Sequence, residues 1–179
     1  MNEAHADPIR PGPDNSPLPG GELVFRLPRE PNLDRVNREL LDQLAAGLSV
    51  PDFFNLSSDD KDSPIPHLSM WCEKLTTVAQ AWVLSGSRPA NKYLVRLPVD
   101  AVRRVGPLDV RWFRALTSGP DGPCLEMRPG WQGHCGVTGL VESTDKIARR
   151  ALRLKLVDIA NKVSCRRLTL AEMSGTPDE

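Results

Sequence analysis

Between residues 93 and 105 the sequence reads Tyr93-Leu94-Val95-Arg96-Leu97-Pro98-Val99-Asp100-Ala101-Val102-Arg103-Arg104-Val105. Its first five residues favour a β-strand, and the proline that follows suits the first turn of a short helix. Gly106-Pro107 breaks that helix. A parallel crossover needs roughly a dozen residues or more, which this segment cannot supply. We therefore predict an α+β fold, with a mixed or antiparallel sheet and helices packed on one face.

Similar patterns on both sides of this stretch predict the other elements. Period-two alternation or β-propensity predicts strands over residues 22–27, 67–72, 108–113 and 133–141, with a return strand near 124–127. Apolar spacings of three and four predict helices over residues 32–48, 77–84 and 145–163. The last of these is the longest.

Composition predicts three regions. Residues 1–21 are rich in proline and glycine and hold little apolar surface, which predicts a flexible tail. Residues 22–173 are long enough for one compact α+β domain with its own core. Residues 174–179 are expected to fray.

Charge and cysteine content indicate an ordinary intracellular protein. The 23 basic residues balance 23 acidic ones, so no global field favours a nucleic acid or a membrane surface. The N-terminus lacks the apolar run of a signal peptide, and no stretch is apolar enough to span a membrane. Four cysteines without C-x-x-C spacing favour free thiols. We therefore expect a cytoplasmic protein.

A cluster of basic residues on the terminal helix and the residues after it is the strongest candidate for binding. Eight basic residues face only two acidic ones between positions 145 and 167, and those expected to bind a partner are Lys146, Arg149, Arg150, Arg153, Lys155, Arg166 and Arg167. A cationic ridge of this kind could neutralise several phosphates. The alternative is a solvated face whose arginines pair with the acidic loop at 59–62 or with an acidic partner protein. The absence of interleaved aromatic residues favours that alternative.

Two short segments contain the residues that could carry chemistry. They hold His67 and Cys72, then His134 and Cys135. A thiolate activated by a histidine, or a zinc site, could be assembled from them. Neighbours on a strand point to opposite faces, however, so His134 and Cys135 could share one metal only from a loop or bulge. Buried structural residues are the simpler interpretation.

Two further patterns resemble ligand sites only weakly. Glycines recur every three residues from Gly130 to Gly139, but the lysine and the spacing of a phosphate-binding loop are missing, so turns and bulges explain them better. Asp59, Asp60 and Asp62 lack the pattern of a calcium loop and are expected to be solvated.

These observations rank three functions. The first hypothesis is a small accessory protein of bacterial type that binds another protein, possesses no active site and needs no cofactor or metal. The second is a nucleic-acid-associated module that uses the basic helix at 146–167. The third is a cysteine- or zinc-dependent enzyme built on the two His/Cys segments. A membrane partner is not expected.

Overall fold

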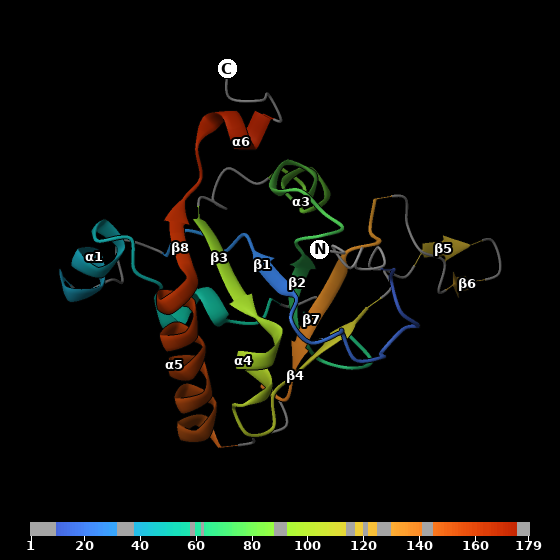
Figure 1. Ribbon diagram of the computed structural model, residues 1–179, viewed down its shortest axis with the longest axis horizontal. Coiled ribbons are helices and arrows are strands. Elements are labelled where there is room, and N and C mark those ends of the chain that lie inside the picture. Colours follow the sequence, from blue (N-terminus) through green and yellow to red (C-terminus); the bar gives the residue numbers. More distant parts are fainter. Residues whose placement is uncertain are drawn as a thin grey trace, which may run out of the picture.

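The computed structural model describes residues 10–31, 38–57, 60–61, 63–87, 93–113, 117–119, 122–124, 130–140 and 145–174. Its centre is a six-stranded sheet in which every neighbouring pair is antiparallel (Figure 1). The predicted α+β domain is therefore confirmed, and of the two sheet types considered the antiparallel one is present. The order of the strands is β4-β7-β2-β1-β3-β8.

The predicted strands are all present, and a further one follows the longest helix. The main sheet consists of β1 (Leu23–Arg26), β2 (Leu68–Cys72), β3 (Tyr93–Pro98), β4 (Asp109–Trp112), β7 (His134–Thr138) and β8 (Ser164–Arg167). The unpredicted strand β8 continues directly from the helix and pairs with β3. The return strand expected near 124–127 overlaps β6 (Gly122–Cys124), which pairs with β5 (Thr117–Gly119) in a hairpin apart from the main sheet (Figure 1). Residues 125–127 lie outside the described residues.

The helices lie on both faces of the sheet, whereas the sequence predicted one. The 3₁₀-helix η2 (Pro51–Phe54), α4 (Val99–Arg103) and α5 (Lys146–Val163) contribute to the larger core, which contains Met70 and Val110. The short helices α3 (Val78–Leu84) and α6 (Leu170–Ser174) pack on a smaller core around Phe25 and Trp71. Alternate strand residues point to opposite faces, so Met70 and Trp71 enter different cores. The second helical layer is small and includes α6, for which the sequence showed no period.

Local signals fix ends of two helices, α3 and α5. Thr77 and Gln80 form a complete capping box at the start of α3, and Gly86 takes a positive φ of 82° just after its end. Asp145 caps α5 by accepting a hydrogen bond from the Ile147 amide. The helix predicted over 32–48 is described as α1 (Arg38–Ala45), while 32–37 lie outside the described residues. Its leucines are less buried than the periodicity implied, because Leu41 is 42% exposed.

Residues 10–21 contradict the prediction of a solvated tail. The Asn15 amide donates to the Trp112 carbonyl at 2.8 Å, and the Leu18 amide donates to the Val110 carbonyl at 2.9 Å. Leu18 is buried in the larger core, and Pro17 forms a bridge with Arg111. Backbone bonds to an open strand edge and one buried leucine hold a segment whose composition alone is poor in apolar residues. Residues 1–9 and 175–179 lie outside the described residues.

Candidate functional site

The cations of α5 separate into two groups. Lys146, Arg150 and Lys155 are exposed, whereas Arg149 and Arg153 are half-buried. Helix α5 packs on η2 and β3, and 3.6 residues per turn carry positions 149 and 153 toward that contact. The predicted cationic ridge is therefore narrower than the sequence count suggested.

The two half-buried arginines of α5 pack against the rest of the domain. Arg153 donates a hydrogen bond to the side-chain oxygen of Asn55, just after η2. Arg149 places its Nε in the interior, where this atom has no hydrogen-bond partner among the described residues. Both side chains thus contribute to packing between α5 and the domain.

The arginines of β8 form ion pairs. Arg166 makes a two-pronged contact with Glu172 of α6, in which its Nη1 lies 2.7 Å from Oε2. Hydrogen bonds from Arg166 lower the pKa of Glu172 to about 2. The Arg167 Nη2 lies 3.3 Å from the Glu30 Oε1. These two arginines therefore stabilise contacts around β8 as well as carrying charge.

An apolar stripe runs along the outer surface of α5, and the sequence analysis did not single it out. Ile147 is 78% exposed and Leu154 is 45% exposed, with the exposed Ala151 between them. Positions i, i+4 and i+7 share one helix face, so these residues form a continuous stripe, here called the outer stripe. Arg150 lies to one side and Lys155 to the other. The sequence does contain a signal for this stripe, because Ile147, Ala151 and Leu154 form a second apolar face of the helix, opposite the face that contains Leu156.

The structure places the two cysteines and the two histidines of the candidate chemical site on different faces of the sheet. His134 points to the side of Trp71, while Cys135 and Cys72 belong to the larger core on the other side. Register explains this separation: β7 runs as a regular strand through positions 134–138, and its side chains alternate. No cysteine–histidine pair is assembled from these four residues.

Burial makes the thiols poor nucleophiles. Cys72 and Cys135 are both free and fully buried, and desolvation raises the pKa of each thiol. Cys165 is half-buried, and its pKa is raised to about 11 for the same reason. A thiolate is the reacting species, so these environments disfavour reaction near neutral pH. The side chain of Cys124 lies outside the described structure.

His67 and His134 do come together, within a group of aromatic rings. The His67 ring stacks on Phe113 with centroids 3.6 Å apart and planes 4° apart. The His134 ring meets Trp71 and Trp131 edge-on, at 5.2 and 4.9 Å. The two imidazole centroids are 5.9 Å apart. We call these five residues the histidine cluster.

Glycine at position 136 allows this arrangement. A Cβ there would lie 2.4 Å from the His67 Cδ2, so only glycine lets the imidazole lie against β7. A close approach of a side chain to the backbone thus explains one of the four regularly spaced glycines.

Asp60 also departs from its expected position. The loop around it was predicted to be solvated, but Asp60 is buried, and it accepts hydrogen bonds from the Ser69 hydroxyl and the Ser57 amide. Arg26 lies 3.9 Å from its second oxygen. Asp59 and Asp62 lie outside the described residues.

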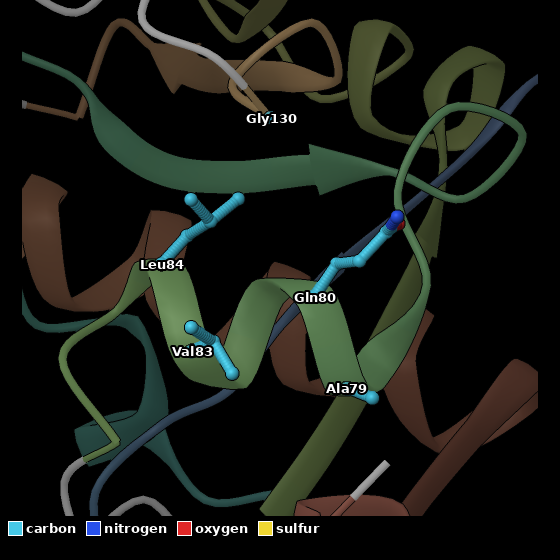
Figure 2. Close-up of a pocket in the computed structure, with 5 residues that line it drawn as sticks. All are labelled: Ala79, Gln80, Val83, Leu84 and Gly130. Atoms are coloured by element: carbon cyan, nitrogen blue, oxygen red, sulfur yellow. The ribbon is translucent and has the colours of Figure 1, made fainter.

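A shallow apolar groove of about 320 Å³ lies beside α3 (Figure 2). Ala79, Gln80, Val83 and Leu84 form its helical wall, and Gly130 faces them. Leu84 and Gln80 extend from the helix on the side of Gly130 (Figure 2). The Gln80 side chain also accepts a hydrogen bond from the Thr77 amide, so it is engaged in the capping box.

The described ranges contain neither a candidate metal site nor a candidate membrane span. Within them, no three histidine, cysteine, aspartate or glutamate side chains converge where they could hold a metal ion. The helices described there are all too short or too polar to cross a bilayer. No family model matches this sequence, and neither a curated protein nor a solved structure matches the chain.

Proposed function

We propose that this protein is a non-enzymatic accessory protein that binds another protein through the outer stripe of α5. The observation that carries the proposal is the exposure of Ile147, Ala151 and Leu154 on one helix face, between Arg150 and Lys155. Protein interfaces combine an apolar centre with a polar rim, and this surface has that arrangement. A scattered exposed leucine would need no explanation, but an aligned stripe is a candidate contact surface.

Charge complementarity indicates the kind of partner. Arg150 and Lys155 are exposed on either side of the stripe, and Lys146 adds a third exposed cation at its beginning. A partner segment with apolar side chains flanked by carboxylates would match both the centre and the rim. We therefore propose an acidic partner protein. The reducing cytoplasm is the proposed location, because Cys72, Cys135 and Cys165 are free thiols.

Nucleic acid fits this surface less well. Strong electrostatic binding to DNA involves about 6–10 phosphate contacts. The four exposed cations of α5, which are Lys146, Arg150, Lys155 and Lys162, cannot supply that number, and Arg166 and Arg167 already pair with carboxylates. The exposed side chains of Ile147 and Leu154 would also face phosphates, with which apolar groups make no favourable interaction.

A two-stage experiment tests the proposal. A photoreactive amino acid at position 151 of the full chain is cross-linked in the native cells with and without nuclease, and the attached protein is identified. That protein is then purified and titrated against the variants Ile147→Ser/Leu154→Ser and Arg150→Glu/Lys155→Glu. We expect cross-linking to an acidic protein, in the same yield with and without nuclease. The affinity of that protein for each double variant should be at least about fivefold lower than for the wild type, since central interface residues contribute more than about 1 kcal/mol.

Matched control variants carry the same substitutions elsewhere. Val83→Ser changes an exposed valine on α3, and Arg104→Glu changes an exposed arginine at the end of α4. Both should retain wild-type affinity. Equal loss of binding in control and stripe variants, or cross-linking to nucleic acid in place of protein, would refute the proposed surface.

A further inference from the structure

The histidine cluster contains two of the three histidines in the chain, His67 and His134, and both side chains are at least nine-tenths buried. The His67 Nδ1 lies 2.8 Å from the Ile65 carbonyl oxygen, and the His134 Nδ1 lies 3.1 Å from the Phe113 carbonyl oxygen. A carbonyl oxygen can only accept, so each imidazole donates from a protonated Nδ1. The remaining basic atom in each ring is Nε2. Acid therefore adds its proton at Nε2 in both histidines.

Proton uptake at these atoms conflicts with the packing. The two rings are 5.9 Å apart, Phe113 covers His67, and Trp71 and Trp131 cover His134. Removal from water penalises a charged imidazole, and two such charges would repel at this separation. Burial is the main cause that lowers the pKa of both histidines, and it brings the pKa of His134 to about 4.

Charged groups on neighbouring segments act in the opposite direction. Asp60 lies before β2, and Asp14 belongs to the segment that packs along β4; both carboxylates raise the pKa of His67 and His134. The charge of His67 further lowers the pKa of His134. The carboxylates reduce the cost of protonation but do not remove it, since the pKa values remain below the ordinary one.

We propose that the histidine cluster is an acid-sensitive latch, in which protonation of His67 and His134 separates Phe113 and Trp131 from the imidazoles while the larger core stays folded. The two cores are on opposite faces of the sheet, and the tryptophans that meet His134, Trp71 and Trp131, belong to the smaller core and not to the one that contains α5. Phe113 directly follows β4, and Trp131 lies in the short turn before β7. Their backbone hydrogen bonds with His134 are at the first residue of β7, so their movement would loosen the end of that strand and leave its middle paired. Local opening of this kind costs less than global unfolding.

The latch also bears on the groove beside α3. Gly130 forms one wall of the groove and is the chain neighbour of Trp131 (Figure 2). Movement of Trp131 out of the cluster would carry Gly130 away from Leu84. The groove should therefore widen and expose more of α3 in acid. This consequence does not depend on the surface proposed for α5.

The test acidifies the full-length protein from pH 7.5 to 3.5, because burial lowers the pKa of His134 to about 4. The imidazole C–H signals of the three histidines are followed by NMR, tryptophan emission reports the cluster, and far-UV circular dichroism reports the helices. We expect His67 and His134 to titrate below pH 6.5, and tryptophan emission to shift to longer wavelength over the same range without a matching loss of helix signal. In Trp131→Phe, most of this emission change should be lost.

Variants locate the cause. Asn can replace the Nδ1 donor of histidine but does not titrate, so His67→Asn/His134→Asn should lose the emission transition. His5→Asn is the matched control, and it should keep the transition. Three results would overturn the latch: ordinary or raised titration of the two buried histidines, loss of helix signal together with the emission change, or a transition that survives in the double variant. If the double variant does not fold, the wild-type NMR titration and the comparison of the two spectroscopic signals still decide the matter.

Discussion

His134 and Cys135 are neighbours in the chain but belong to different cores. Side chains alternate along β7, so the histidine joins Trp71 and Trp131 while the cysteine joins Met70 and Val137. The sequence suffices to predict this separation once position 134 is assigned to a strand. It does not predict that His67 and His134 meet, because that contact depends on the pairing of β2 with β7, which no local pattern specifies.

Thiol reactivity provides the first prediction. All of the described cysteines should react with iodoacetamide at pH 6.5 more slowly than a free thiol, because burial raises their pKa values. Cys165 is only half-buried and should react before Cys72 and Cys135. The Cys124→Ser variant is used, with site-by-site mass spectrometry as the measurement. A cysteine that reacts faster than the free thiol would contradict this prediction and support the hypothesis of a thiol enzyme.

For helix α5, the periodicity of apolar residues predicts the span of the helix but not the burial of each residue. The predicted span, 145–163, is confirmed, because the helix runs from Lys146 to Val163 and Asp145 is its cap. Among the apolar residues whose spacing of three and four predicted this helix, Leu156 is fully buried and Leu152 is half-buried, but Val163 is 40% exposed. The pattern predicts the direction of the inner face. How deeply each position is buried depends on the neighbouring elements η2 and β3, whose positions the sequence leaves open.

Two leucines of α5 provide a matched pair of substitutions. Leu156→Ala should lower the free energy of unfolding by about 2–5 kcal/mol, because it creates a cavity in the larger core. Leu154→Ala removes an exposed side chain and should change this free energy by less than about 0.5 kcal/mol. Urea unfolding followed by circular dichroism measures both. Comparable effects of the two changes would mean that the inner and outer faces of α5 are assigned wrongly.

Residues 15–18 act as an additional edge element beside β4. Composition indicated a flexible tail, since it measures only how much apolar surface a segment has. The structure adds what composition omits, namely backbone hydrogen bonds to Val110 and Trp112 and a place for Leu18 in the core. Pro17 has no amide hydrogen, so this outer segment is also a poor template for a further strand.

Leu18→Ala tests that docking. Because Leu18 is 1% exposed, its truncation should cost about 2–5 kcal/mol and lower the melting temperature by several degrees. Ser16→Ala is a suitable control, since its hydroxyl donates to the Pro13 carbonyl within the same segment. Thermal unfolding of both variants is the measurement. An unchanged melting temperature for Leu18→Ala would restore the interpretation of a solvated tail.

For the whole molecule, stability should fall in two separate pH ranges. The pKa of His134 is lowered to about 4 in the folded state, so the unfolded chain binds protons first and stability is lost as pH falls from about 6.5 toward 4. The pKa of Glu172 is lowered to about 2, so its ion pair with Arg166 is lost only below about pH 4.5.

Urea unfolding at intervals between pH 7.5 and 3 resolves the two ranges. His67 and His134 together can contribute at most about 2.7 kcal/mol per pH unit to the slope. We expect His67→Asn/His134→Asn to flatten the upper range alone and Glu172→Gln to flatten the lower range alone. The same slope above pH 5 in the wild type and the histidine variant would contradict the assignment.

Much of the architecture follows from the sequence, but the surface that we propose for function does not. The short segment at 98–105 disfavours a parallel crossover, which predicts a mixed or antiparallel sheet, and the main sheet is the antiparallel one of these two. The charge count of α5 correctly indicates a basic helix, yet only the packed structure distinguishes Arg150, which is exposed, from Arg153, which bonds to Asn55. The environments of Arg150 and Arg153 differ because of contacts between segments that are far apart in the sequence.

Hydrogen–deuterium exchange on the complex with the cross-linked partner tests where this molecule binds. The full chain is labelled alone and with the purified partner at saturation, at neutral pH. We expect the partner to slow backbone amide exchange most strongly in peptides from residues 146–158, centred on Ile147, Ala151 and Leu154. Exchange in the peptides of α3 should be unchanged. Protection centred on α3 and Gly130, with exchange in α5 unaffected, would contradict the proposal that the outer stripe is the binding surface.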